Sequence, residues 1–577
     1  MSELLSVSTP ERTSKKKKRD GRDRVRSKPK GRRVDPQARE DVLALLGDAP
    51  RRRDLLIEHL HKIQDRYGCL SAPHLVALAD QMKMAMAEVY EVATFYHHFD
   101  VIKEGEAKPP AITVRVCDSI SCELAGSHHL LDKLPALLGS GVRVLHAPCV
   151  GRCETAPVAV VGQNPILNAT VEQVTKAVQT GQVTHSKTNQ AVTPGHIGYA
   201  AYRAAGGYAL ALSCIAGNKK AADVVATMED SGLRGLGGAG FPAGRKWKLV
   251  AAEPAPRLMA INIDEGEPGT FKDRYYLERD PHRFLEGALI AAWAVGIEAI
   301  YIYLRDEYHG CREILEREIE ALQAHPPYAL PQVYLRRGAG AYICGEESSM
   351  IESIEGKRGE PRLRPPYVAQ VGLFGRPTLE HNMETLHWVR DILEKGAAWF
   401  AGQGRHGRKG LRSFSVSGRV KKPGVHLAPA GITLRELIDE YCGGMLDGHE
   451  LYAYLPGGAS GGILPASKAD IPLDFDTLTE YGCFIGSAAI VVLSQKDTAA
   501  AAARNLMKFF ADESCGQCTP CRVGTIKALQ LMEEKHWDAP LLQELSQAMM
   551  DASICGLGQA APNPVLTVLK YFPGEVK

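Results

Sequence analysis

The sequence predicts a multidomain protein of mixed α/β and α+β type. Its 577 residues exceed what a single hydrophobic core usually supports. Between residues 196 and 410, β-rich runs such as RLMAINI and EAIYIYLR alternate with helical runs such as RFLEGALIAAWAVG, which is the pattern of an α/β core. Eight of the 14 cysteines fall into two motif groups in different parts of the chain. Several units with separate tasks are therefore expected.

The first third of the chain is expected to contain four segments. Residues 1–36 are rich in Lys and Arg and nearly lack apolar side chains, which predicts a disordered basic arm. Residues 37–108 carry apolar residues at helical spacing and predict a helical bundle. Residues 109–182 read as strand, helix, strand, strand, which predicts a small α/β domain. Residues 183–195 are polar and predict a linker.

The remainder is expected to form three units: the α/β domain over residues 196–410, a compact mixed unit over 411–496 and a helical end over 497–577. The longest apolar stretch, Phe284 to Leu304, is interrupted by glycine and glutamate and ends in the β-rich IYIYL. It therefore predicts a helix leading into a buried strand and not a membrane span.

Composition excludes several functions. A formal net charge of +2 on 577 residues gives no general case for nucleic-acid binding. No apolar segment comes closely enough after the basic arm for a secretory signal. Cysteines grouped in motifs in such a chain usually bind metal. We therefore expect a cytoplasmic protein without membrane or nucleic-acid partners.

The first cysteine group comes after two predicted strands. It comprises a C-x4-C pair and a C-x3-C pair, Cys117 with Cys122 and Cys149 with Cys153. Four thiolates on two adjacent loops can enclose a [2Fe–2S] cluster. A four-cysteine zinc site uses similar spacings, so that spacing alone leaves zinc open.

The second cysteine group lies in the C-terminal unit. ESCGQCTPCR supplies three ligands in a C-x2-C-x2-C run, and a fourth lies downstream in SICGLG: Cys515, Cys518, Cys521 and Cys555. Three close cysteines and a remote one suit a [4Fe–4S] cluster better than zinc. A helix expected after Pro520 would direct its positive end at the cluster. The remaining six cysteines are expected to be small buried side chains, and Cys344 is the one among them that we single out for inspection in the structure.

A glycine-rich loop opens the α/β unit. SGLRGLGGAGFPAGRKW fits G-x-G-x-x-G at three glycines, Gly235, Gly237 and Gly240. The dinucleotide fingerprint needs a strand before it and a helix after it. Here a helical run precedes the loop, and Pro242 with Gly244 is expected to interrupt the segment after it. Bare glycine backbone still allows a phosphate or a flavin ring to approach closely, with Phe241 as a stacking face and Lys246 as a positive charge. An ordinary flexible loop is the alternative.

Acidic side chains gather where a predicted strand ends. INIDEGEPGTFKDR places four polar residues at the carboxyl edge at which open α/β sheets bind ligands, Asn262, Asp264, Glu265 and Glu267. A second segment, YICGEESSM, begins a helix with Gly345, Glu346 and Glu347. Single acidic residues at helix starts are commonly solvated. Their convergence in one domain favours a binding site for ribityl or ribose hydroxyls.

These segments together resemble a fusion of the two NADH-dehydrogenase-module subunits of respiratory complex I, a module also used as the diaphorase of formate dehydrogenases and NAD-linked hydrogenases. EVATFYHHF with the first cysteine group is similar to the thioredoxin-like [2Fe–2S] subunit. GLGGAGFPAGRKW, DEGEPGTFKDR, YICGEE and ESCGQCTPCR are similar to the flavoprotein subunit, whose FMN domain is not a Rossmann fold. The unit over 411–496, with SGRVKKPG, resembles a ubiquitin-like β-grasp domain of the soluble-ligand-binding type.

The resemblance implies FMN, NAD(H), one [2Fe–2S] cluster and one [4Fe–4S] cluster. It implies FMN contacts from Gly235, Gly237, Gly238, Lys246, Asn262, Asp264, Glu265, Gly345, Glu346 and Asn382. It implies that NAD(H) stacks on the flavin among Phe241, Glu267, Glu347, Arg364 and Tyr367. A flavin can link two-electron hydride transfer to one-electron clusters, so no side chain need act as an acid, base or nucleophile.

The sequence also departs from the complex I pattern. Leu236 stands where that pattern has Arg, and His381 where it has Asn, which changes how the flavin phosphate would be neutralised. The fused arrangement, this leucine and the basic arm favour the β subunit of a molybdenum- or tungsten-dependent formate dehydrogenase, with the formate-oxidising site on an α-subunit partner that carries further iron–sulfur clusters. The diaphorase of an NAD-reducing hydrogenase or a complex I-like enzyme is the alternative. A non-catalytic zinc scaffold binding nucleic acid is the rival from another class.

Overall fold

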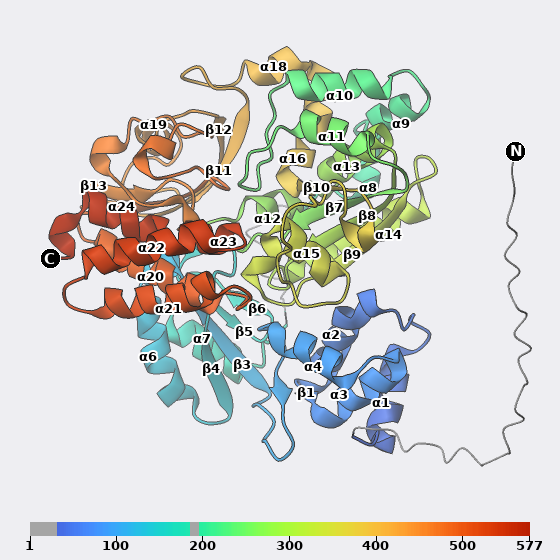
Figure 1. The fold of residues 1–577 in the computed structure, drawn as a ribbon, viewed down its shortest axis with the longest axis horizontal. Helices are drawn as coiled ribbons and strands as arrows, with labels where there is room; N and C mark the ends of the chain where they lie inside the picture. The colour runs from blue at the N-terminus through green and yellow to red at the C-terminus, as the bar shows by residue number, and fades with distance from the viewer. Residues whose placement is uncertain (1–31, 185–194) are drawn as a thin grey trace, which may run out of the picture.

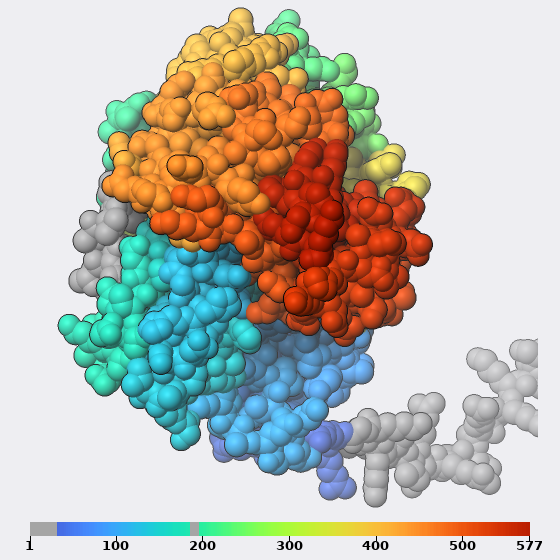
Figure 2. All heavy atoms as spheres, turned by 90° about the vertical axis from the view of Figure 1, so that its left-hand side faces the viewer, coloured from blue at the N-terminus to red at the C-terminus, as the bar shows by residue number. Residues whose placement is uncertain are grey.

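The computed structural model describes residues 32–184 and 195–577. Five compact units pack against one another. In Figure 1 the C-terminal helices lie between the mixed unit above and the small α/β domain below, and Figure 2 shows that the mixed unit also meets the small α/β domain directly. The predicted arm lies outside the described residues except for its last five, and Pro36 already belongs to the first helix. The predicted linker falls outside them over residues 185–194. No helix among the described residues is long and apolar enough to cross a bilayer.

The N-terminal unit is a helical bundle. Its helices are α1 (Pro36–Leu46), α2 (Leu56–Tyr67), α3 (Ala72–Met82) and α4 (Met86–Phe95). The side chain of Asp35 caps α1 by accepting a hydrogen bond from the backbone N–H of Ala38, and Gly68 ends α2 in the left-handed conformation. The short strands β1 (Leu70–Ser71) and β2 (Val101–Ile102) pair in parallel, which joins the segment after α4 to the segment between α2 and α3. The predicted bundle is confirmed.

The small α/β domain has a four-stranded sheet in the order β4-β3-β5-β6, in which β3 and β4 are parallel and the others antiparallel. Its elements are β3 (Ile112–Cys117), α5 (Ile120–Leu124), α6 (Ser127–Leu138), β4 (Val142–Ala147), β5 (Ala159–Val161), β6 (Asn164–Ile166) and α7 (Val171–Gln179). Because β3 and β4 run the same way, the loops after them emerge at one edge. Cys117 ends β3 and Cys122 lies in α5 directly after it, and Cys149 and Cys153 lie in the segment after β4.

The large α/β domain contains an all-parallel sheet in the order β10-β7-β8-β9. Its strands are β7 (Arg257–Ile263), β8 (Ile297–Leu304), β9 (Gln332–Arg337) and β10 (Thr378–Asn382). Its helices are α8 (Tyr199–Ala204), α9 (Ala209–Ile215), α10 (Ala221–Asp230), α11 (Ala243–Ala251), α12 (Lys272–Leu277), α13 (Pro281–Val295), α14 (His309–Ala324), α15 (Glu347–Ile354), α16 (Met383–His387), α17 (Val389–Lys395) and α18 (Ala397–Ala401). The predicted helix leading into a buried strand is α13 followed by β8.

One expectation for the glycine-rich loop is wrong. Pro242 and Gly244 do not interrupt the chain, because α11 begins at Ala243 directly after the proline. Proline is tolerated at a helix start, where its missing N–H has no partner in any case. Gly244 lies where α11 packs on α10, since a Cβ there would be 2.3 Å from the Glu229 nitrogen. One helix therefore precedes the loop and another comes after it, and the rejection of a dinucleotide fingerprint now rests on the missing strand alone.

The mixed unit is a five-stranded sheet in the order β12-β11-β15-β13-β14 with a helix packed on it. Its elements are β11 (Leu411–Gly418), β12 (Gly424–Pro429), α19 (Leu434–Glu440), β13 (Leu451–Leu455), β14 (Leu464–Pro465) and β15 (Ala489–Ser494). The C-terminal unit is helical as predicted. It contains α20 (Ala499–Asp512), α21 (Thr519–Glu533), α22 (Ala539–Ala552), α23 (Gly556–Ala560) and α24 (Asn563–Tyr571).

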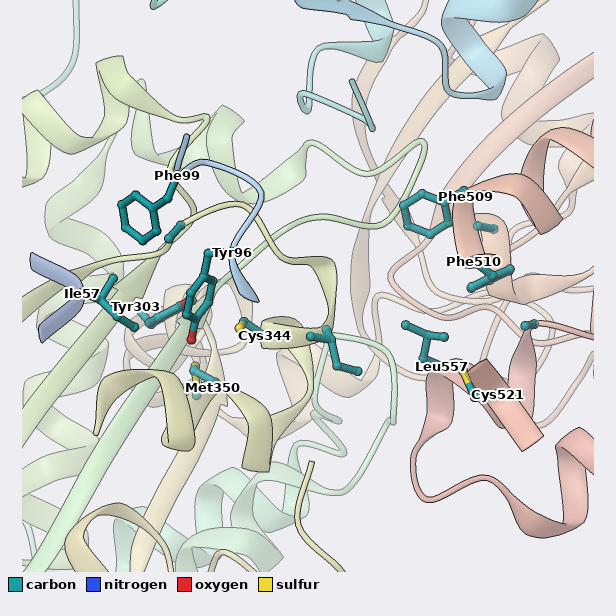
Figure 3. Close-up of a cluster of buried hydrophobic side chains, with 14 of the residues drawn as sticks. Ile57, Tyr96, Phe99, Tyr303, Cys344, Met350, Phe509, Phe510, Cys521 and Leu557 are labelled. Atoms are coloured by element: carbon teal, nitrogen blue, oxygen red, sulfur yellow. The ribbon is translucent and has the colours of Figure 1, made fainter. Parts of the chain in front are cut away.

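One apolar core draws buried residues from all five of these units. Figure 3 shows Tyr96 and Phe99 from the N-terminal unit packed beside Tyr303, Cys344 and Met350 of the large α/β domain, and, in a second group, aromatic side chains of α20 beside the C-terminal cysteines. The Tyr96 hydroxyl donates to the carbonyl oxygen of Lys357 at 2.8 Å. The N-terminal bundle is therefore fixed against the α/β domain by buried contacts.

Candidate functional site

The first cysteine group is assembled at one edge of the small α/β domain. Cys117 ends β3 and pairs with Ala147 of β4, so that Cys122 and the Cys149–Cys153 loop start from adjacent positions. The sulfurs of Cys149 and Cys153 are 3.3 Å apart. Hydrogen bonds with Cys122 and Cys149, together with burial, raise the pKa of the Cys117 thiol. All four side chains are buried and in reach of one another, a donor set that fits a small thiolate-bound cluster.

Two arginines of the large α/β domain hold the Cys149–Cys153 loop. Arg274 donates to the carbonyl oxygen of Gly151 at 2.8 Å, and Arg305 donates to that of Cys149 at 2.7 Å. Gly151 cannot carry a side chain, because a Cβ would be 2.3 Å from the Tyr308 hydroxyl oxygen. The loop therefore lies directly on the domain that is predicted to bind FMN.

The second cysteine group is assembled by the loop before α21, which carries Cys515, and by the starts of the two helices α21 and α23. Cys518 is the N-cap of α21, which begins at Thr519, two residues before the expected start after Pro520, and Cys555 is the N-cap of α23. Cys521 lies in the first turn of α21, and a Cβ at Gly558 would be 2.8 Å from its Cβ, so only glycine lets α23 approach. Burial raises the pKa of Cys521 to about 11 and that of Cys555 to about 12. Two helix N-termini face the thiols, which suits an anionic cluster.

The remaining six cysteines are buried, as predicted for structural side chains, at Cys69, Cys214, Cys311, Cys344, Cys442 and Cys483. Cys344 belongs to the shared apolar core and lies close to the tyrosines Tyr96 and Tyr303. Burial raises its pKa to about 12. Among the described residues, the only other cysteines that belong to this core are those of the second cysteine group.

The predicted flavin residues meet at the carboxyl ends of β7 and β10. Asn262 donates its side-chain amide to the Gly345 carbonyl oxygen at 2.8 Å. A Cβ at Gly237 would be 2.9 Å from the Cβ of Asn382, which brings the glycine loop against the end of β10. A Cβ at Gly345 would be 3.1 Å from the Asp264 carbonyl oxygen. Backbone without side chains therefore forms the walls of this site, as a close-fitting planar ring requires.

Asp264 offers an open acceptor in this site. Its Oδ2 atom is buried and has no hydrogen-bond partner among the described residues. Burial raises the pKa of this carboxyl well above its ordinary value. A buried oxygen without a partner costs free energy unless a ligand group hydrogen-bonds to it. Asp264 thus fits the hydroxyl of a bound flavin chain.

Glu265, another predicted flavin residue, is already engaged by protein. Its Oε1 accepts from the Asp273 backbone at 2.8 Å, and its Oε2 accepts from the Arg274 backbone at 3.2 Å and from the Tyr308 hydroxyl at 2.8 Å. Burial raises its pKa to about 7. These contacts fix the start of α12 and give Glu265 a role in shaping the site.

The predicted nicotinamide residues are spread along the opening of the same site. Arg364 pairs with Glu347 at 2.9 Å and also with Glu346. Phe241 and Tyr367 are exposed, at 39% and 55%, and the guanidinium of Arg245 lies 5.9 Å from the centroid of the Phe241 ring. Glu267 differs, because its Oε1 accepts from the Ser460 backbone at 2.8 Å and from the Ser460 hydroxyl at 2.6 Å, which links this acid to the mixed unit.

Two residues that sequence reasoning missed complete the site. Glu380 accepts from Lys246 and lies beside Asn262, and burial raises its pKa. Tyr342 donates its hydroxyl hydrogen to Glu267, packs its ring against that of Phe509 at 4.9 Å and donates its backbone N–H to Glu513 at 2.9 Å. An acidic residue inside the strand PTLEHN was the only signal for Glu380. Tyr342 joins the nicotinamide site to the helices of the second cysteine group.

The departures from the resemblance are buried side chains. Leu236 is 3% exposed, and its backbone N–H donates to the Thr385 hydroxyl at 2.9 Å. His381 accepts from the Trp247 indole N–H at 2.7 Å, and burial lowers its pKa well below the ordinary value. Both therefore contribute packing to the wall of the site and no positive charge.

Four protein families match successive parts of the chain. The thioredoxin-like [2Fe-2S] ferredoxin family matches residues 42–182, and the Nuo51 FMN-binding domain matches residues 228–391. The SLBB domain matches residues 413–464, and the NADH-ubiquinone oxidoreductase-F iron-sulfur binding region matches residues 501–577. The predicted fold class and the cofactors FMN, NAD and both iron–sulfur clusters are thereby confirmed. Zinc, left open for the first cysteine group, is rejected.

Individual relatives show how much of the chain is shared. The chain is 41% identical over 404 residues to the NADH-quinone oxidoreductase F 2 subunit of Rhizobium meliloti (strain 1021), covering 67% of this chain and 95% of that protein. It is 41% identical over 375 residues to the mitochondrial NADH dehydrogenase [ubiquinone] flavoprotein 1 of Dictyostelium discoideum, covering 61% of this chain and 78% of that protein. A chain in the crystal structure of an air-oxidized NAD⁺-reducing [NiFe]-hydrogenase superposes with a TM-score of 0.79 at 30% identity, covering 92% of this chain and 94% of that one.

Proposed function

This chain belongs to the family of NADH-oxidising flavoprotein subunits of NADH-quinone oxidoreductase, and on that premise we propose that it is the NAD⁺-reducing diaphorase subunit of a cytoplasmic formate dehydrogenase complex. Passing electrons between NAD(H), FMN and iron–sulfur clusters is the activity of the family. The formate-oxidising partner, bearing molybdenum or tungsten and further clusters, is the part that we add.

One observation carries the diaphorase assignment: both cysteine groups adjoin the same acidic residue of the predicted nicotinamide site. Glu267 lies close enough to Cys149 for that thiol to raise its pKa, although burial is the larger cause. Tyr342 binds Glu267. Burial raises the pKa of Tyr342, and the nearby Cys555 adds to that rise, so the tyrosine lies close to the second cysteine group. Both predicted clusters would therefore be next to the flavin site, as short-range electron transfer demands.

The side chains of this chain hold and orient the bound groups. FMN, when bound, supplies the exchange between hydride transfer and single-electron transfer. Asp264, with its open oxygen, and the glycine loop position the flavin chain and ring, and Lys246 places a positive charge beside them. Phe241 and the Arg364–Glu347 pair line the opening where NAD(H) would stack. No side chain is assigned as a general acid, base or nucleophile.

Formate as the electron source is proposed from the fused arrangement of the chain. The two complex I-like parts are on one polypeptide, and the sequence offers no recognisable site for molybdopterin or nickel. The oxidation of formate must then occur on another subunit. We propose that electrons from that subunit enter through the cysteines of the C-terminal unit and leave to NAD⁺, a direction that NADH can reverse.

The diaphorase of an NAD-reducing hydrogenase is the second candidate, favoured by the hydrogenase chain that superposes on 92% of this one. Purification of the native complex from its source distinguishes the two. Formate-dependent NAD⁺ reduction with stoichiometric molybdenum or tungsten would support our proposal. Hydrogen-dependent reduction with nickel would replace it. A purified chain lacking NADH-dependent reduction of an artificial acceptor such as ferricyanide would refute the diaphorase assignment itself.

A further inference from the structure

A group of metal-ligating side chains lies outside both cysteine groups, where the N-terminal bundle meets the large α/β domain. His61 and Asp65 are on α2, and His98 comes after α4 in the EVATFYHHF segment. Each residue brings one ligand atom to within 4.8 Å of the other two. His61 and Asp65 are four residues apart, so that they share one face of the helix. Two residues of one helix and one residue of a distant segment therefore place their ligand atoms close together.

Hydrogen bonds orient both imidazoles. The His61 Nε2 atom is 2.8 Å from the carbonyl oxygen of Gly338. Because a carbonyl only accepts, Nε2 carries the hydrogen and Nδ1 keeps its lone pair. The His98 Nδ1 atom is 2.7 Å from the Asp306 carboxylate, which assigns the hydrogen to Nδ1 and leaves the lone pair on Nε2.

The two remaining nitrogens have no protein partner. His61 Nδ1 and His98 Nε2 are both buried without a hydrogen bond among the described residues. Leaving buried polar atoms unpaired destabilises the fold. Metal-binding histidines characteristically donate their other ring hydrogen to a carbonyl or a carboxylate, as both do here. The pair therefore has the outer hydrogen bonds of metal ligands.

Asp65 supplies an oxygen at the edge of the group. Its Oδ2 atom is 2.6 Å from Arg337 Nη1, whereas its Oδ1 is 3.4 Å from Nη2 and so is held only loosely. The side chain is 41% exposed, which gives an ion and its remaining water a path from solvent. Arg337 also donates to Asp306 at 2.5 Å, so the same guanidinium fixes the carboxylate that orients His98.

We propose that His61, Asp65 and His98 bind one divalent transition-metal ion, with water completing the coordination. Two imidazole nitrogens and one carboxylate oxygen suit Zn²⁺, which takes four ligands of this kind. Such an ion would join α2 to the segment after α4, while the hydrogen bonds of the two histidines connect this pair to the loops after β8 and β9, where Asp306 and Gly338 lie. Its role is structural, and it does not depend on which enzyme supplies electrons to the flavin.

The test measures zinc on the full-length chain with both iron–sulfur clusters loaded. Wild type, His61→Gln, His98→Gln and His59→Gln are depleted with a chelator, equilibrated with micromolar ZnSO4 by dialysis and analysed for zinc and iron. Equal iron in all four samples excludes zinc in the cysteine sites. His59 is the matched control, because it is on the same helix, buried and also without a partner at Nδ1, but belongs to no group of three possible ligands among the described residues. Flavin content and circular dichroism establish that each variant is folded.

We expect one zinc per chain in wild type and in His59→Gln, and a loss of affinity of at least about tenfold in His61→Gln and His98→Gln. Zinc should also raise the melting temperature of wild type but not of His98→Gln, because a ligand that binds only the folded state stabilises it. Wild type that binds no zinc would overturn the proposal. So would folded His61→Gln and His98→Gln that retain it, or a His59→Gln control that loses it equally.

Discussion

The side-chain nitrogen of Lys246 lies 3.0 Å from the carbonyl oxygen and 3.3 Å from the carboxylate oxygen Oε2 of Glu380. The pair joins α11, directly after the glycine loop, to β10, which ends at Asn382. Burial raises the pKa of Glu380, and the positive charge of Lys246 opposes that rise. Lys246 is therefore the cation held at the base of the predicted flavin site.

Replacing Lys246 by Met should weaken FMN binding. The substitution removes a charge-assisted donor next to an anionic cofactor and leaves Glu380 buried without its cation, and an effect of about 1.5–3 kcal/mol corresponds to roughly 10–100-fold in Kd. Fluorescence titration of the deflavinated chain with FMN measures this. Lys248→Met, on the exposed face of the same helix, is the control. Equal affinity in both variants would remove Lys246 from the site.

Substitution of the predicted ligands should remove one cluster at a time. Cys555→Ser should lose the iron of the [4Fe–4S] centre and keep the [2Fe–2S] signal, and Cys117→Ser should do the reverse, because the two sets are on different units. Iron analysis and electron paramagnetic resonance of the dithionite-reduced protein report each cluster. Cys442→Ser, a buried isolated cysteine of the mixed unit, serves as control. Loss of both signals from one ligand variant would contradict the assignment.

Removing Arg274 should release the first cysteine loop. Its guanidinium bonds the carbonyl oxygen of Gly151 and pairs with Glu278 at 2.7 Å and with Glu154. Arg274→Met leaves Glu154 without its cation and leaves Glu278 with Arg152 alone, at 3.1 Å. Breaking a buried ion pair by removing one partner typically costs about 3–5 kcal/mol. We expect a lower melting temperature and faster loss of the [2Fe–2S] signal in air. Arg279→Met should behave as wild type, because among the described residues the Arg279 side chain contacts only Tyr275 of α12.

The stability of the chain should fall as the pH drops below 6.5. Burial lowers the pKa of His387 to about 3, so the folded ring stays neutral while the unfolded ring gains a proton near its ordinary pKa. The free energy of unfolding then decreases as pH falls from 6.5 towards 3, by up to about 1.4 kcal/mol per pH unit for this group.

His387→Phe keeps an aromatic ring against Tyr276, whose ring centroid is 4.1 Å away, but cannot take up a proton. Melting temperatures between pH 5.0 and 7.0 should therefore fall less steeply for this variant than for wild type. Parallel curves for the two proteins would show that His387 does not titrate on unfolding in this range. A comparison at pH 8 separates any loss of packing from the titration.

The sequence predicted what depends on local pattern. Cysteine spacing indicated both clusters, and the strand INI before DEGE placed Asn262 and Asp264 at a sheet edge. Contacts between segments that lie far apart in the chain could not be predicted from the sequence. Glu380 reaches Lys246 across 134 residues, and Tyr342 reaches Glu513 across 171, so no spacing rule connects them. The wrong expectation at Gly244 has the same origin, because its tolerance in a helix comes from packing on α10 and not from propensity.

The hold of Arg274 and Arg305 on the first cysteine loop also bears on how the protein is made. Arg274 comes 123 residues after Gly151, and Arg305 comes 156 residues after Cys149. At translation speeds of about 5–20 residues per second, the ribosome delivers the cysteines many seconds before the arginines that cover them. A nascent chain consequently presents this metal-binding loop uncovered, which sets a time window in which iron–sulfur delivery and oxidation compete for the same thiols.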